Sequence, residues 1–168
     1  AIAEDGGAPI TEDAVIVVKA RIEKDLCTIS IDTSGGLLHK RGSKQAMAKA
    51  PLRETMAALL LRECGYAGRE PVLDPMCGSG TFVIEAAEWA LGLKPGRNRA
   101  FAFEHLATFD AARFHSLKDS PLLHSGEPPR FTGSDRDAGA VRASAENAAR
   151  AGVADVTSFT CRPVSEVM

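Results

Sequence analysis

The chain has 168 residues, of which 45% are hydrophobic and 25% are charged, and its formal net charge is -2. These values are ordinary for a globular protein, so they exclude a disordered or fibrous chain, and the length allows one full-sized domain. No apolar run approaches the roughly 20 residues that span a bilayer, and the four cysteines are scattered like reduced thiols rather than zinc or disulfide cysteines. We expect a cytoplasmic protein with no membrane segment and no metal, and the sequence indicates no oligomeric state.

The sequence predicts a β-hairpin near the start of the chain. Residues 14–20 are β-branched, residues 26–31 alternate between apolar and polar, and residues 23–25 would form the turn. A hairpin is too small to be stable alone, so we expect that the chain starts inside a larger architecture. Residues 36–53 carry only basic charges and could attract a polyanion, with a solvated surface as the alternative. The candidate nucleic-acid contacts are Lys40, Arg41, Lys44 and Lys49.

From residue 46 onwards, helix and strand patterns alternate. The predicted order is a helix from Ala50-Pro51 to Gly65, a strand over 71–73, a helix over about 81–91, a strand over 130–135, a helix over 137–152 and a strand over 156–161. Residues 92–130 contain turn-forming prolines and four phenylalanines, and we interpret them as an insertion with one short helix near 110–117. The alternation predicts a Rossmann-like α/β fold with a doubly wound, mainly parallel sheet.

The segment DPMCGSGTF, residues 74–82, places two glycines at the first strand-to-helix turn, where such sheets bind their ligands. A triphosphate loop would need a lysine after Gly80, and a dinucleotide loop would need a third glycine where Val83 stands. Asp74 at the strand end would repel a pyrophosphate but suits a cationic ligand. S-adenosylmethionine meets these demands, because its ammonium and sulfonium suit Asp74, its carboxylate suits a helix N-terminus, and its ribose suits Asp135 at the next strand end.

Each of these signals also has a purely structural interpretation. The glycines could form an ordinary turn, Asp74 could belong to the same turn, and Asp135 could cap the helix that follows it. Cys77 is interpreted as a small packing residue, because the sequence places no basic group beside it that would lower its pKa. The combination of loop, acid and fold order favours the donor site.

Five segments in order carry a more specific signal: SIDTSGGLLHKRG (30–42), APLRETMAALLL (50–61), VLDPMCGSGTFVIEAA (72–87), KPGRNRAFAFE (94–104) and GSDRDAGAVRASAENAARAGV (133–153). Together they resemble the THUMP-associated class I RNA methyltransferases. The likeness is greatest to the bacterial enzymes that methylate N2 of a guanine in 23S ribosomal RNA, a group also labelled N6-adenine-specific DNA methylases. It extends over nearly the whole chain.

The resemblance implies a partial class I S-adenosylmethionine-dependent methyltransferase fold, with the methyl donor as cofactor and RNA as partner. Residues 30–41 resemble the link from an RNA-binding THUMP domain, so residues 1–45 would be linker. Residues 46–168 would be the N-terminal part of the methyltransferase domain, with an insertion at about 92–130. The methionine part of the donor would be surrounded by Asp74, Pro75, Cys77, Gly78, Ser79, Gly80 and Thr81. Asp135 would bind the ribose, Arg136 and Asp137 would flank the adenine, and Ala50, Pro51 and Leu52 would close the pocket.

The sequence departs from the family pattern in two places. Cys161-Arg162-Pro163 offers no acid to the adenine amine, and the catalytic element, Asn or Asp followed by Pro-Pro and an aromatic residue, does not occur. That element would orient the lone pair of the target amine and stack on a flipped base. We therefore expect an RNA methyltransferase parent, a fragment that is inactive alone, and no catalytic residue within this chain. DNA adenine-N6 methylation and a non-catalytic binding module are the alternatives.

Overall fold

The structure is a computed structural model that describes residues 11–42, 52–119 and 129–167. Its contacts divide the chain into two units, residues 1–37 with 100–114 and residues 38–99 with 115–168. The predicted boundary at residues 45 and 46 and the predicted insertion at 92–130 stay predictions. None of the described helices is long and apolar enough to cross a membrane.

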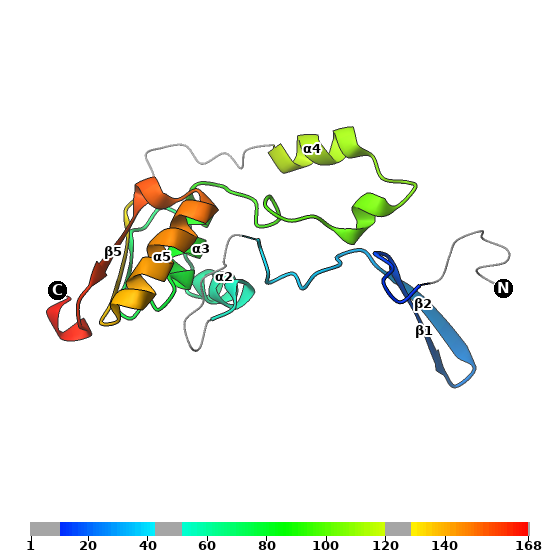
Figure 1. The fold of residues 1–168 in the computed structure, drawn as a ribbon, viewed down its shortest axis with the longest axis horizontal. Helices are drawn as coiled ribbons and strands as arrows, with labels where there is room; N and C mark the ends of the chain where they lie inside the picture. The colour runs from blue at the N-terminus through cyan, green and yellow to red at the C-terminus, as the bar shows by residue number, and fades with distance from the viewer. Residues whose placement is uncertain (1–10, 43–51, 120–128, 168) are drawn as a thin grey trace. The chain divides into compact units, whose positions relative to one another are not determined.

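The first unit contains the antiparallel hairpin of β1 (Val17–Glu23) and β2 (Leu26–Asp32) (Figure 1). Lys24 and Asp25 form its turn with φ values of 48° and 63°. Two positive φ values give the turn the twist that matches a hairpin, although neither residue is glycine. The predicted hairpin is confirmed, but β1 runs later than the predicted 14–20, because a two-residue turn pairs Glu23 directly with Leu26.

The first unit also contains a cluster of four phenylalanines: Phe101, Phe103, Phe109 and Phe114. The ring centroids of Phe101 and Phe103 are 5.2 Å apart, and those of Phe103 and Phe114 are 5.1 Å apart. Phe103 lies in the short helix η1 (Ala102–His105) and Phe114 in the helix α4 (Ala111–Asp119), whereas Phe101 and Phe109 lie just before these helices. The expected helix near 110–117 is confirmed, as is its packing by phenylalanines.

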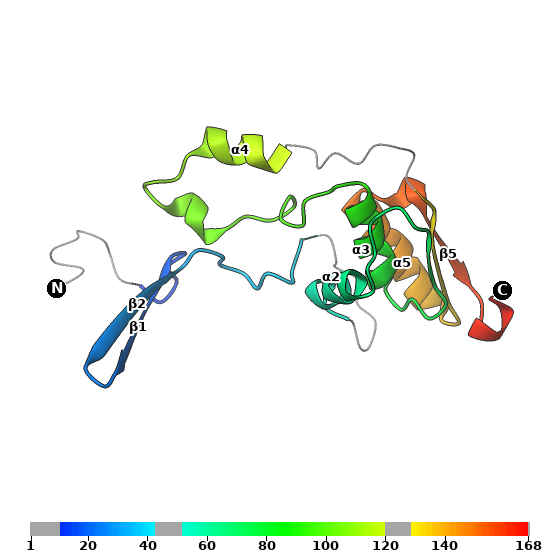
Figure 2. The same cartoon turned by 180° about the vertical axis from the view of Figure 1, so that it is seen from behind.

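The second unit contains a parallel sheet in the order β3 (Val72–Asp74), β4 (Phe131–Asp135) and β5 (Thr157–Cys161). The helices α2 (Glu54–Glu63), α3 (Thr81–Ala90) and α5 (Ala138–Ala151) lie on one side of this sheet (Figures 1 and 2). Two short turns, η2 (Ala154–Val156) and η3 (Val164–Glu166), complete the unit. The predicted α/β order and parallel pairing are confirmed. The strands β3, β4 and β5 and the helices α3 and α5 lie within one residue of their predicted bounds, whereas α2 begins at Glu54, later than the predicted start at Ala50-Pro51.

Local signals fix the ends of α5. The Asp137 carboxylate accepts hydrogen bonds from the N–H groups of Gly139 at 2.7 Å and Ala140 at 3.3 Å, and so caps the helix. Gly152 ends it with a φ of 72°. The helix thereby packs Ala148 and Ala151 into the core beside Phe131, which is fully buried.

Candidate functional site

The segment from Asp74 to Thr81 leaves the carboxyl end of β3 and enters α3, as predicted. Gly78 and Gly80 have φ values of 55° and 81°, in the left-handed region that favours glycine. The N–H of Gly80 donates to the carbonyl of Cys77 at 2.8 Å, and the N–H of Cys77 donates to the carbonyl of Ser134 at 2.9 Å. These bonds form a tight turn fastened to the neighbouring strand β4.

Two carboxylates end the adjacent strands β3 and β4 beside this loop. Asp135 accepts hydrogen bonds from the N–H groups of Gly78 and Asp137, each at 3.0 Å, on different oxygens. Asp74 accepts one from the N–H of Met76 at 3.0 Å. Burial raises the pKa of Asp74, the Met76 amide opposes this, and the nearby Asp135 charge adds to the increase. The pair therefore favours a cationic group between the two strand ends.

The two glycines of the loop have different surroundings. A Cβ added at Gly80 would lie 3.0 Å from the Ser144 Cβ and 3.1 Å from the Phe159 ring, so this side is packed. A Cβ added at Gly78 would meet no heavy atom within 4 Å. A ligand can therefore approach the backbone from the Gly78 side, where Asp135 already bonds the loop. The cation and the ribose hydroxyls of S-adenosylmethionine fit this pair of acids, and its carboxylate fits the N-terminus of α3.

The structure places the other predicted site residues as follows. Thr81 and Ser79 are buried, Pro75 and Leu52 are half-buried, and Arg136 and Asp137 are exposed. Ala50, Pro51, Lys44 and Lys49 lie outside the described residues. Asp137, rather than Asp135, caps α5, so the capping alternative for Asp135 was wrong.

Cys77 has the packing role expected for it. It is 6% exposed, and its sulfur lies 3.8 Å from the Ser144 hydroxyl oxygen. Burial raises the pKa of its thiol to about 11. The thiol is therefore protonated at neutral pH and is not a nucleophile.

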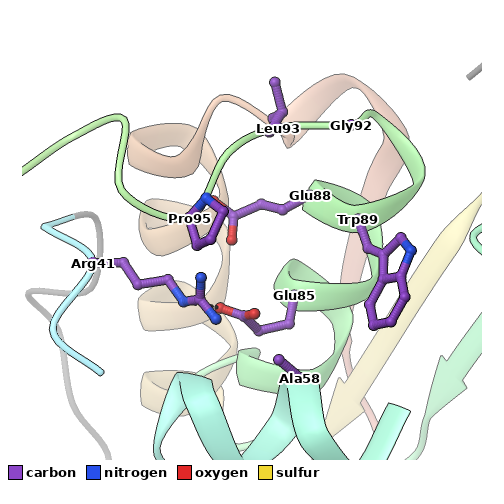
Figure 3. Close-up of a pocket in the computed structure, with 8 residues that line it drawn as sticks. All are labelled: Arg41, Ala58, Glu85, Glu88, Trp89, Gly92, Leu93 and Pro95. Atoms are coloured by element: carbon purple, nitrogen blue, oxygen red, sulfur yellow. Dashed lines mark ion pairs between the residues drawn. The ribbon is translucent and has the colours of Figure 1, made fainter. Parts of the chain in front are cut away.

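A cavity of about 200 Å³ lies away from the strand ends, beside α3 (Figure 3). Its lining residues are Arg41, Ala58, Glu85, Glu88, Trp89, Gly92, Leu93 and Pro95. Arg41 reaches Glu85 on α3, with 2.9 Å between Nε and the carboxylate, and its side chain is 10% exposed. A phosphate contact by Arg41 would first have to open this ion pair, whereas Lys40 is exposed and its nucleic-acid role stays a prediction.

Two buried glutamates on α3 are each paired with an arginine. Burial raises the pKa of Glu85 to about 8, although Arg41 opposes the increase. Burial also raises the pKa of Glu88, against the effect of Arg97 at 2.6 Å. Arg97 additionally donates to the carbonyl of Ala151 at the end of α5. Because both acids have arginine partners, we assign them to the framework that holds α3 rather than to a ligand site.

Two residues on α5 contact the loop and were not singled out from the sequence. Ser144 and Asn147, each at most 1% exposed, donate to the carbonyls of Gly78 and Ser79. The sequence does contain one signal for this contact: two polar residues, three positions apart, lie on an alanine-rich face of the predicted helix. A polar side chain on a buried face needs a hydrogen-bond partner, so the pair indicates a polar contact there. The sequence did not name that partner, which lies far away along the chain.

The comparisons with known proteins agree with this geometry. The family model described as the RMKL-like methyltransferase domain matches residues 41–167. The ribosomal RNA large subunit methyltransferase K/L of Psychromonas ingrahamii is 41% identical over 162 residues, covering 93% of this chain and 22% of the relative. The protein of the same name from Vibrio parahaemolyticus is 36% identical over 158 residues, covering 90% and 22%. The chain thus spans about a fifth of these relatives.

Solved structures of similar chains give the same result. The crystal structure of SMU.472 complexed with SAH superposes with a TM-score of 0.79 at 32% identity, covering 90% of this chain and 40% of that one. The structure of a predicted N6-adenine-specific DNA methylase from Listeria monocytogenes gives 0.80 at 36% identity, with coverage of 90% and 40%. The resemblance to the family and the fold class are thereby confirmed.

Proposed function

The chain belongs to the RMKL-like methyltransferase domain family, and we propose that it is the donor-binding part of an enzyme that methylates N2 of a guanine in large-subunit ribosomal RNA. The observation that carries this proposal is the pair of carboxylates, Asp74 and Asp135, at adjacent strand ends beside a glycine loop that is open at Gly78. The name of the curated relatives supports ribosomal RNA as substrate. We place the reaction in the cytoplasm.

S-adenosylmethionine, when bound, supplies an electrophilic methyl group on its sulfonium. In the proposed site Asp74 balances the positive charge of the donor, and the N-terminus of α3 with Thr81 attracts the donor carboxylate. Asp135 binds the ribose hydroxyls. Each Asp135 oxygen has a second lone pair beyond the bond it makes to Gly78 or Asp137, so the carboxylate can accept the hydroxyls without releasing the loop.

The remaining contacts follow the family pattern, and we propose them for the positions that match it. Arg136 and Asp137 flank the adenine, and the N–H of Arg162 donates to the carbonyl of Asp135 at 3.0 Å, which supports the strand end from the far side. The methionine part is surrounded by Pro75, Cys77, Gly78, Ser79 and Gly80, with Leu52 opposite. Lys40 is the described candidate for an RNA phosphate contact.

We propose that these 168 residues bind the donor but do not transfer the methyl group alone. The Asn or Asp-Pro-Pro-aromatic element that would orient the target amine is absent from the sequence. The relatives reported above are more than four times as long as this chain. We propose that the parent protein carries this element and an RNA-binding THUMP region outside these 168 residues. In this proposal residues 1–45 are linker, and residues 46–168 are methyltransferase domain with an insertion at about 92–130.

Donor binding is tested by thermal melting of the chain with S-adenosylhomocysteine. Ligand at 100 times its dissociation constant should raise the melting temperature by about 5–10 °C. The Asp135→Ala variant should lose most of that shift. Asp155→Ala, an exposed acid in η2, is the matched control and should keep it. No shift at millimolar ligand would contradict the donor-binding role.

A second candidate, DNA adenine-N6 methylation, is favoured by the name of the Listeria neighbour. The two candidate functions are separated by measuring the transfer of a labelled methyl group by the full-length protein to unmodified ribosomal RNA and to DNA. N2-methylguanosine in RNA is the expected product. N6-methyladenine in DNA would overturn the RNA assignment but not the donor site.

A further inference from the structure

Two buried side chains of α5 bind consecutive carbonyls of the glycine loop. The Ser144 hydroxyl oxygen lies 2.8 Å from the carbonyl of Gly78, and the Asn147 amide nitrogen lies 3.1 Å from the carbonyl of Ser79. The two side chains are one helical turn apart, so they face the loop together. The hydroxyl also lies 3.0 Å from the carbonyl of Ala140, one turn back on α5, and shares its single proton between the two carbonyls.

The Asn147 amide is itself held by a neighbour. Arg150 donates from Nη2 to the Asn147 side-chain oxygen at 2.6 Å. An arginine can only donate, so it selects the amide orientation in which the oxygen faces Arg150 and the nitrogen faces the loop. The contact to Ser79 is therefore set by the hydrogen-bond network around it.

These carbonyl contacts orient the peptide planes of the loop. In a trans peptide the carbonyl and the following N–H point in opposite directions. Because the Gly78 carbonyl faces Ser144, the Ser79 N–H points away from α5. The neighbouring amides are engaged elsewhere, since the Gly78 N–H donates to Asp135 and the Gly80 N–H donates to the Cys77 carbonyl.

We propose that Ser144 and Asn147 are positioning residues for the methyl donor. They act through the loop: their hydrogen bonds fix the two peptide planes that follow Gly78 and Ser79, next to the Gly78 N–H that donates to Asp135, and so keep the open side of Gly78 toward the ligand. A loop with two positive-φ glycines in three positions has many other conformations, so it needs such anchors. The inference rests on the proposed donor-binding function.

The test measures the dissociation constant for S-adenosylhomocysteine by calorimetry, together with the melting temperature without ligand, for three variants of the chain. Ser144→Ala removes the hydroxyl, and Asn147→Asp keeps the shape but replaces the amide donor by an acceptor. Val153→Ala creates a buried defect beyond the far end of α5, away from the loop, and is the control for lost stability alone. Each loop-anchor variant should weaken ligand binding about tenfold, and the control less than about twofold.

The outcomes separate this inference from the function on which it rests. All three variants should melt at lower temperature, so a merely structural role predicts equal affinities among them. Unchanged affinity in Ser144→Ala and Asn147→Asp would overturn the positioning role alone. Failure of the unsubstituted chain to bind the ligand would overturn the proposed function and this inference together.

Discussion

The hairpin β1–β2 and the sheet β3–β4–β5 are both β structure, but their residues differ in solvent exposure. All seven residues of β1 are exposed, whereas Phe131, Gly133 and Ser134 of β4 are buried. The hairpin has one apolar face, and Ile22 and Ile29 on it are 76% and 64% exposed. Its shape therefore comes from its own turn and register, while the sheet depends on contacts with distant residues. Substitutions should consequently have large effects in the sheet and small effects in the hairpin.

The largest effect is expected for Gly133→Ala in β4. The added Cβ would lie 2.7 Å from the Phe159 ring and 3.0 Å from the Cys77 Cβ, both of them in packed surroundings. We expect the free energy of unfolding in urea to fall by about 3 kcal/mol. Adding Phe159→Leu should recover part of this loss, since it removes the clashing ring. Simple additivity of the two losses would contradict the clash as the cause.

The next effect concerns pH and the buried acid Glu85. Its folded-state pKa of about 8 lies above the ordinary value of 4.5, so the folded chain holds an extra proton between these values. The free energy of unfolding should therefore fall as pH rises from about 4.5 to 8, by on the order of 2 kcal/mol. Glu85→Gln should flatten this slope in urea melts at several pH values. Glu146→Gln, whose side chain is 62% exposed, should leave it unchanged.

A smaller effect is expected at the edge of the sheet that carries the site. A bound cation would lower the pKa of Asp74, which burial raises in the free chain. Donor affinity should therefore weaken as pH falls into the acidic range and Asp74 takes up a proton. Asp74→Asn should bind S-adenosylmethionine about tenfold more weakly near neutral pH and remove most of this dependence. If donor affinity in Asp74→Asn still weakens as pH falls, the pH dependence arises from another titratable group.

The smallest effect is expected in the hairpin. Ile29→Thr keeps the β-branch on an exposed face and should change the free energy of unfolding by less than about 0.5 kcal/mol. Phe131→Leu in β4 is the comparison, with an expected loss of about 1 kcal/mol. A loss above 1 kcal/mol for Ile29→Thr would indicate that this apolar face is covered in the isolated chain.

The parts of the structure that were predictable rest on local signals. Asp137 and Gly152 mark the ends of α5 because capping uses residues next to the helix. Asp74 and Asp135 were found together because parallel strands end at the same edge of a sheet. The predicted strand over 14–20 begins before β1 (Val17–Glu23), because the prediction followed the β-branched residues. The two-residue turn instead determines which residues pair.

Side-chain partnerships across the second unit could not be predicted. Glu85 and Glu88 have the spacing of a solvated helix face, yet they are buried because Arg41 and Arg97 reach them from other segments. Nothing near either acid in sequence names its arginine. The same holds for Ser144, whose partner is a loop carbonyl 66 residues away. Pairings of this kind depend on the fold being already in place.

The pairing of β3 with β4 also bears on the order in which the protein folds. These strands are neighbours although roughly 60 residues of chain lie between them, so they pair only after a long loop has closed. The entropy lost in that closure grows slowly, by about 0.6 kcal/mol for each doubling of the loop. The hairpin, by contrast, closes over two residues and can form in microseconds. Asp74 and Asp135 stand on the late-forming pair, so we expect ligand-binding competence to arise at the end of refolding, after most helical signal has recovered.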